Sequence, residues 1–156
     1  MSAKTLIAYF SATGTTAGVA KRMADGIGAD LYEIRPRTPY TERDLDWTDR
    51  KSRTTMEKND EGCRPELADA VPDVSGYDTI LLGFPVWWYV EPRIVDTFLD
   101  AASIDGKRIA AFATSGGSDV AGCVSHMRSL HPEAVWEKGK LLNSGDAVAW
   151  ARSVTE

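Results

Sequence analysis

Apolar residues along the chain occur in two patterns, as short unbroken runs and as runs in which every third or fourth residue is apolar. Unbroken runs are typical of strands buried on both faces, and the spaced pattern is typical of helices with one buried face. Together with the turn residues between them, these patterns predict strands near 6–10, 30–34, 79–84, 108–113 and, more weakly, 134–142. They predict helices near 19–27, 65–70, 92–99, 119–130 and 144–154.

The predicted strands and helices alternate along the chain. Such alternation is typical of a doubly wound α/β fold, in which helices cover both faces of a mostly parallel sheet. The chain has 156 residues, the size of one ordinary domain, and no linker, repeat or low-complexity tract divides it. We therefore predict a single three-layer α/β domain over residues 1–156.

Composition and charge narrow the class of function. The 18 Lys and Arg residues against 23 Asp and Glu give a net charge of −5, which argues against a nucleic-acid partner. No apolar run approaches the roughly 18 residues of a membrane span, and the N-terminus lacks a signal-like segment, so we expect no membrane partner and a cytoplasmic location. Two distant cysteines, and His126 and His131 five residues apart, match no metal-ligand spacing, so we expect no metal.

The first predicted strand ends in a loop rich in hydroxyl groups, Ser11-Ala12-Thr13-Gly14-Thr15-Thr16, which opens a helix. The first amides of a helix lack partners within it, and the helix dipole adds partial positive charge, so such a loop can bind an anion. The loop lacks the Gly-Lys-Ser/Thr ending of nucleoside-triphosphate loops and the three glycines of dinucleotide loops. A single phosphate monoester fits best, and an ordinary capped helix start is the alternative.

Two further loops follow the third and fourth strands, at the edge where α/β sheets bind ligands. Residues 85–92, Pro-Val-Trp-Trp-Tyr-Val-Glu-Pro, contain three consecutive aromatic residues. Three such rings cannot all point into one core, so we expect Trp87 or Trp88 to contact a flat conjugated heterocycle, with structural packing as the alternative. Residues 114–118, Thr-Ser-Gly-Gly-Ser, would let the backbone approach the polar edge of that ring.

Residues 37–64 break the pattern of short connections. The segment is rich in charged residues of both signs, but it also contains Tyr40, Trp47 and Met56, which are too apolar for a simple linker. Two interpretations stay open: a surface flap packed against the domain, and a lid over the ligand site.

The three loops in this order resemble those of the flavodoxin family. Residues 11–16 look like the flavodoxin phosphate loop, and the resemblance extends over the whole chain. The Pro-Val-Trp-Trp sequence and Asp46-Trp47-Thr48 are most similar to the branch found in anaerobic and lactic bacteria. The resemblance implies a five-stranded parallel sheet of order 2-1-3-4-5. It also implies that FMN lies with its phosphate on the first loop and its isoalloxazine ring between the other two.

The resemblance assigns cofactor-binding residues and no catalytic acid or base. The phosphate would be held by Ser11, Thr13, Gly14, Thr15 and Thr16. The ring would be flanked by Pro85, Val86, Trp87 and Trp88, and its polar edge would be contacted by Thr114, Ser115, Gly116, Gly117 and Ser118.

Two departures from typical flavodoxins change the expectation. The loop after the fourth strand has no aromatic residue before Asp119, so stacking on the ring must come from residues 87–89, with Trp47 of the 37–64 segment as a further candidate. The chain is also less acidic, which predicts a reduction potential less negative than that of the acidic flavodoxins.

The resemblance implies an electron carrier that serves redox partner proteins or a small-molecule acceptor. An NAD(P)H-dependent quinone or flavin oxidoreductase stays open, because residues 37–64 could form a substrate pocket over the ring. A phospho-receiver domain of similar topology is disfavoured, since it needs an aspartate where this chain has Ser11.

Overall fold

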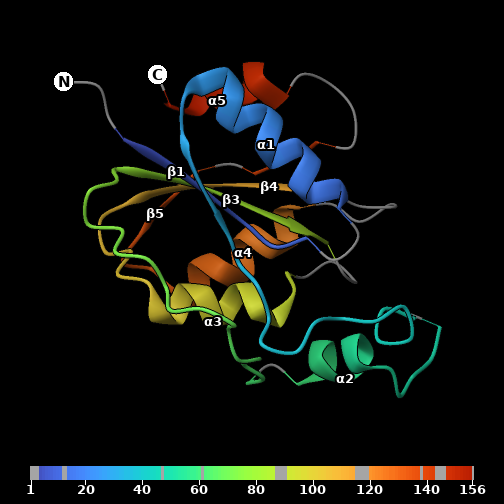
Figure 1. Cartoon of the computed structure of the whole chain (residues 1–156). Helices are drawn as coiled ribbons and strands as arrows, with labels where there is room; N and C mark the ends of the chain where they lie inside the picture. The colour runs from blue at the N-terminus through green and yellow to red at the C-terminus, as the bar shows by residue number, and fades with distance from the viewer. Residues whose placement is uncertain are drawn as a thin grey trace.

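A computed structural model of the chain describes residues 4–11, 14–46, 48–60, 62–86, 91–114, 120–137, 139–142 and 147–155. Helices lie on both sides of a parallel sheet (Figure 1). Its strands are β1 (Thr5–Tyr9), β2 (Asp30–Glu33), β3 (Thr79–Pro85), β4 (Arg108–Thr114), β5 (Val135–Trp136) and β6 (Lys140–Leu141). The helices are α1 (Thr15–Ile27), α2 (Arg53–Asn59), α3 (Arg93–Ala101), α4 (Ala121–Leu130) and α5 (Ala147–Thr155).

The strand order is β2-β1-β3-β4-β5, and the pairings along it are all parallel, which confirms the predicted order. The weak strand expected at 134–142 is divided into two short pieces. Both pair with β4, β5 through Val135 opposite Arg108 and β6 through Lys140 opposite Phe112. No helix among the described residues is long and apolar enough to cross a membrane.

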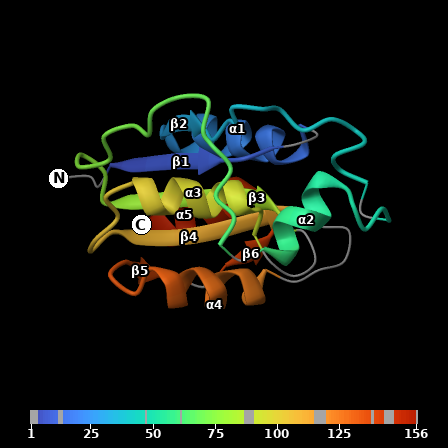
Figure 2. The same ribbon diagram turned by 90° about the horizontal axis from the view of Figure 1, so that it is seen from below.

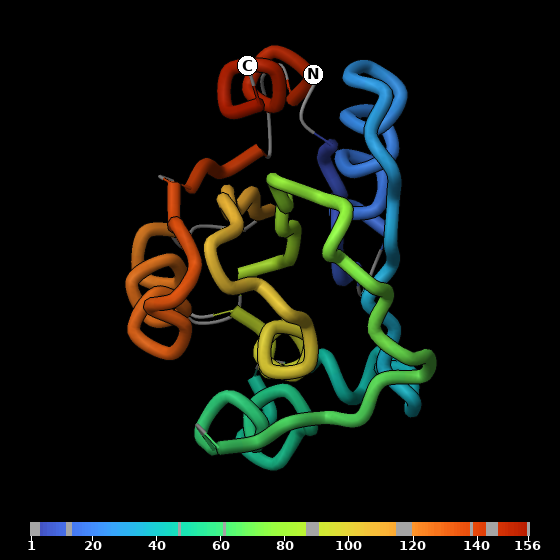
Figure 3. Tube along the Cα trace, turned by 90° about the vertical axis from the view of Figure 1, so that its left-hand side faces the viewer, coloured from blue at the N-terminus to red at the C-terminus, as the bar shows by residue number. Residues whose placement is uncertain are grey.

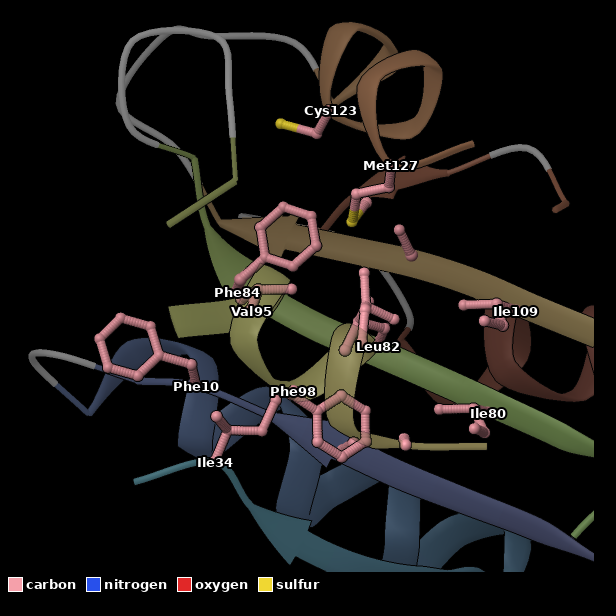
Figure 4. Close-up of a cluster of buried hydrophobic side chains, with 14 of the residues drawn as sticks. Phe10, Ile34, Ile80, Leu82, Phe84, Val95, Phe98, Ile109, Cys123 and Met127 are labelled. Carbon is pink, nitrogen blue, oxygen red and sulfur yellow. The ribbon is translucent and has the colours of Figure 1, made fainter. Parts of the chain in front are cut away.

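The sheet separates two apolar cores. Helices α1 and α5 cover one face and α3 and α4 the other (Figures 1 and 2). Successive residues of β3 alternate between the cores, Leu82 and Phe84 packing with α3 and α4, and Leu81 with α1 and α5. Figure 4 shows the first of these cores, with Phe98 from α3 and Met127 from α4 directed at the sheet. Burial on both faces explains why β3 is an unbroken apolar run.

The prediction of a helix at 65–70 is wrong, and a helix lies instead inside the 37–64 segment. Leu67 forms an antiparallel bridge with Pro36, and the Ala68 amide donates to the Arg35 carbonyl at 2.8 Å rather than within a helical turn. Helix α2 begins after Ser52, whose side chain accepts a hydrogen bond from the Thr55 amide. A serine at the helix start was the sequence signal for α2.

Candidate functional site

The loop between β1 and α1 is closed by a contact between its two ends. The Gly14 amide donates to Ser11 Oγ at 3.0 Å, and the Gly14 carbonyl accepts from the Gly18 amide in the first turn of α1. Gly14 is the N-cap residue and has a φ of +93°, in the left-handed region that favours glycine. The start of α1, with its amides and partial positive charge, therefore opens at the carboxyl end of β1.

A buried pair of hydroxyls joins this loop to the end of β4. Thr16 Oγ1 lies 3.0 Å from Thr114 Oγ1, and both side chains are buried. Because the Thr16 hydroxyl is paired with Thr114, a phosphate on the loop would accept a hydrogen bond from the Thr16 backbone amide more readily than from this hydroxyl. The pair fixes the first predicted loop against the third.

The second and third predicted loops leave the sheet side by side. Pro85 is opposite Thr114 in the register of β3 and β4, and the Val86 amide donates to the Thr114 carbonyl at 2.9 Å. Because β1, β3 and β4 are adjacent and parallel, the described parts of all three loops meet at one edge of the sheet. Seven of the predicted cofactor-binding residues lie outside the described residues, and their assigned contacts stay predictions: Thr13, Trp87, Trp88, Ser115, Gly116, Gly117 and Ser118.

The 37–64 segment packs against the end of β1 through Tyr40. The Tyr40 ring meets Phe10 edge-on at 5.6 Å between centroids, and the Arg53 guanidinium lies 3.8 Å from the Tyr40 ring centroid. The Tyr40 hydroxyl donates to Glu57 of α2. Burial, then the hydrogen bond and charge of Glu57, raise the pKa of Tyr40 well above its ordinary value. Tyr40 therefore remains a neutral donor that ties α2 to the end of β1, next to the first loop.

Arg93 ties the same segment to α3. Its guanidinium donates to the backbone carbonyls of Glu57 (3.2 Å) and Lys58 (2.8 Å), near the end of α2. Arg93 is only 5% exposed. Figures 2 and 3 show α2 beyond the carboxyl ends of the central strands and next to α3. The segment thus extends from the first loop to the start of α3, where a lid would lie, although Trp47 is outside the described residues.

A cavity of about 380 Å³ lies between this segment and the first loop, on the β2 side. Ser11, Tyr40, Arg35 and Arg37 are among its lining residues. Both arginines are paired, Arg35 with Asp69 and Arg37 with Glu66, and Glu33 also lines the cavity, so the lining has no excess of positive charge.

Three ionisable side chains to which the sequence analysis assigned no functional role meet between the start of α3 and the middle of α4. Glu91 (1% exposed) and Asp96 (0%) lie within reach of His126, and the three offer ligand-type atoms within 4.8 Å of one another. Glu91 Oε1 contacts His126 Nδ1, and Asp96 Oδ2 lies 3.5 Å from Arg93 Nη1. We call Glu91, Asp96 and His126 the carboxylate cluster.

Burial is the main influence on this cluster. It raises the pKa of Asp96 to about 8, reinforced by a hydrogen bond with Glu91 and by its charge, and opposed by Arg64 and His126. The sequence held a signal for the cluster. Asp96 lies on the apolar face of α3, which also contains Leu99. An acidic side chain at such a buried position requires polar or charged partners.

Comparison with known proteins relates the chain to one family and to several solved structures. The family profile described as Flavodoxin matches residues 4–153. A provisionally named flavoprotein from Bacteroides uniformis is 40% identical, with a TM-score of 0.92 and 100% of both chains covered. Another from Bacteroides eggerthii is 41% identical, with a TM-score of 0.92 and 97% and 95% of the chains covered. A Lactobacillus acidophilus flavoprotein solved in complex with FMN is 25% identical, with a TM-score of 0.67 and 90% and 93% covered.

No curated protein matches the chain significantly. The profile match nevertheless covers nearly the whole chain, and it agrees with two features of the structure. These are the parallel order β2-β1-β3-β4-β5 and the glycine turn that opens α1 at the carboxyl end of β1. The chain belongs to the flavodoxin family.

Proposed function

We propose that this protein binds FMN and transfers electrons as a flavodoxin-like carrier. The observation that carries the proposal is the turn closed by Ser11 and Gly14, which opens α1 beside the ends of β3 and β4. A flavoprotein of the same fold from Lactobacillus acidophilus was solved in complex with FMN, which supports the choice of ligand. Bound FMN would supply the redox chemistry, and the chain would bind and orient it.

The first loop suits a phosphate monoester because it supplies donors without side-chain charge. The Ser11 hydroxyl accepts from the Gly14 amide and still has its own proton to donate to a phosphate oxygen. The amides at the start of α1 would add further donors. Removing the Ser11 hydroxyl should therefore weaken binding of FMN without disturbing the fold.

Titration of the protein with FMN, followed by flavin fluorescence, tests this proposal. We expect one FMN per chain and much weaker binding of riboflavin, which lacks the phosphate. Ser11→Ala should raise the Kd of FMN about tenfold, since a hydrogen bond to a charged group contributes about 1.5 kcal/mol. Ser153→Ala, at an exposed serine of α5, is the matched control. Equal affinity for FMN and riboflavin would reject the phosphate site.

A reductase is the second candidate, and the 380 Å³ cavity beside the first loop favours it because a carrier needs no such space. The two functions differ in turnover. A carrier passes electrons to a redox partner and does not oxidise NAD(P)H on its own. Sustained oxidation of NADH or NADPH with a soluble quinone would favour the reductase, and its absence with intact FMN binding would favour the carrier.

A further inference from the structure

The carboxylate cluster is adjacent in sequence to both loops that are predicted to hold the flavin ring. Glu91 lies near the end of the aromatic loop, two residues before α3, and Asp96 lies in the first turn of that helix. Helix α4, which carries His126, begins soon after the glycine loop. With a rise of 1.5 Å per residue, Asp96 lies about 5 Å along the axis from the start of α3 and His126 about 8 Å from the start of α4.

Two carboxylate oxygens of the cluster lack a hydrogen-bond donor, and a single proton could supply one to both. Glu91 Oε1 faces His126, and Asp96 Oδ2 faces Arg93. Among the described residues, no donor reaches Glu91 Oε2 or Asp96 Oδ1, although both are fully buried. Glu91 and Asp96 offer oxygens within 4.8 Å of each other, and ionised carboxylates can only accept hydrogen bonds, so a proton held between the two carboxyl groups would supply the missing donor. One proton shared by Glu91 and Asp96 satisfies both atoms.

The charged groups around the cluster favour a proton over a metal ion. Arg93 of α3 faces Asp96 at 3.5 Å, and an incoming cation would be repelled by its guanidinium. His126 of α4 already directs Nδ1 at Glu91. Arg64 also acts on Asp96 by its charge, but it is bonded to Asp100 at 2.7 Å. These neighbours offset the negative charge of the cluster only in part, since burial dominates at Asp96.

We propose that Glu91 and Asp96 share one proton at neutral pH, and that in alkaline solution this pair takes up a proton from solvent when the bound flavin is reduced. The second half rests on the proposed function. Electrons pass from an external reductant such as dithionite to the flavin, and the proton passes from water to the carboxylate pair. Added negative charge on the flavin raises the proton affinity of nearby buried carboxylates, because the interior screens charge weakly.

Infrared spectroscopy tests the shared proton without requiring FMN. The protein as purified should show the carbonyl stretch of a protonated carboxylic acid at pH 7, and the band should disappear as the pH rises well above 8. Asp96→Asn and Glu91→Gln should each remove it. Asp100→Asn, one turn along α3 and nearly half-exposed, should retain it. The proposal would be overturned if, as the pH is raised, the wild-type band were already lost before pH 6. It would also be overturned by binding of one Zn²⁺ ion per chain that both cluster variants abolish.

Proton uptake on reduction tests the coupling. In weakly buffered solution at pH 9 with a pH indicator, dithionite reduction of the FMN-loaded protein should consume up to about one more proton per flavin than reduction of the Asp96→Asn protein. Asp100→Asn should behave as the wild type. Equal uptake by all three proteins would overturn the coupling. Failure to bind FMN would reject the proposed function alone, because the infrared result does not depend on it.

Discussion

The first loop and the carboxylate cluster are both polar, but they handle charge in opposite ways. The first loop, residues 11–16, offers hydroxyls and helix-start amides and contains no charged side chain. The carboxylate cluster places ionisable groups where solvent is excluded. The loop therefore attracts an anion, whereas the cluster can hold only the negative charge that its neighbours and bound protons compensate.

Because of this difference, substitutions in the first loop and in the cluster should affect different properties, ligand binding for the loop and stability for the cluster. The first loop is exposed at Gly14 and half-buried at Ser11, so a change there should alter ligand affinity more than folding. The cluster and Arg93 connect α2, α3 and α4, so a change there should alter folding first. The following predictions test that separation.

The largest expected effect is on the pH dependence of stability. The pKa of Asp96 rises from 3.8 in the unfolded chain to about 8 in the folded protein. Between these values the folded state binds more protons, so this contribution to stability is complete below pH about 4 and is lost as pH rises through 8. The slope is at most about 1.4 kcal/mol per pH unit. Urea unfolding at pH 5 and pH 8 should show this loss in the wild type and not in Asp96→Asn.

Asp100→Asn is the control for that experiment, because Asp100 is on the same helix and nearly half-exposed. It should keep the wild-type difference between the two pH values. If Asp96→Asn and Asp100→Asn respond to pH alike, Asp96 is not the group that holds the proton.

Arg93→Ala should cause the next largest loss. It removes the partner of a fully buried carboxylate and the donor to two carbonyls of α2. Removing Arg93 leaves the single negative charge of the Glu91–Asp96 pair with less compensation, and this should cost about 3 kcal/mol in the free energy of unfolding, measured by urea denaturation at pH 7. Arg37→Ala, which breaks a pair with both side chains more than 70% exposed, should cost less than about 1 kcal/mol. Equal losses would mean that Arg93 is not a structural anchor.

Gly14→Ala should have a smaller effect on stability and a clear one on binding. No atom lies within 4 Å of the added Cβ, so the cost comes only from the φ of +93° and should be about 1–2 kcal/mol. The Kd of FMN should rise about tenfold if the turn relaxes by that amount. Gly76→Ala, which also has open space but no positive φ, is the control and should leave both quantities nearly unchanged.

The contrast between the two regions also explains what the sequence could predict. The first loop is a local pattern, a strand that stops at hydroxyls and a glycine before a helix, so its position was predictable from the residues, whereas the strand order followed only from the resemblance to flavodoxins. The cluster joins Glu91 and Asp96 to His126, thirty residues further along the chain, and only the packing of α3 beside α4 reveals it. Helix α2 was missed for another reason: seven residues give too little periodicity to stand out in a polar segment.

The smallest effect that we predict tests the link between the first and third loops. Thr16→Val leaves the Thr114 hydroxyl buried without its partner and should cost about 1 kcal/mol, as should Thr114→Val. The double variant should cost less than the sum, since neither hydroxyl is then left unpaired. The Kd of FMN should change less for Thr16→Val than for Ser11→Ala, because the Thr16 hydroxyl faces Thr114 rather than the open loop. A Thr16→Val variant that loses FMN as completely as Ser11→Ala would show instead that this hydroxyl turns to the phosphate, and that the buried pair breaks when the ligand binds.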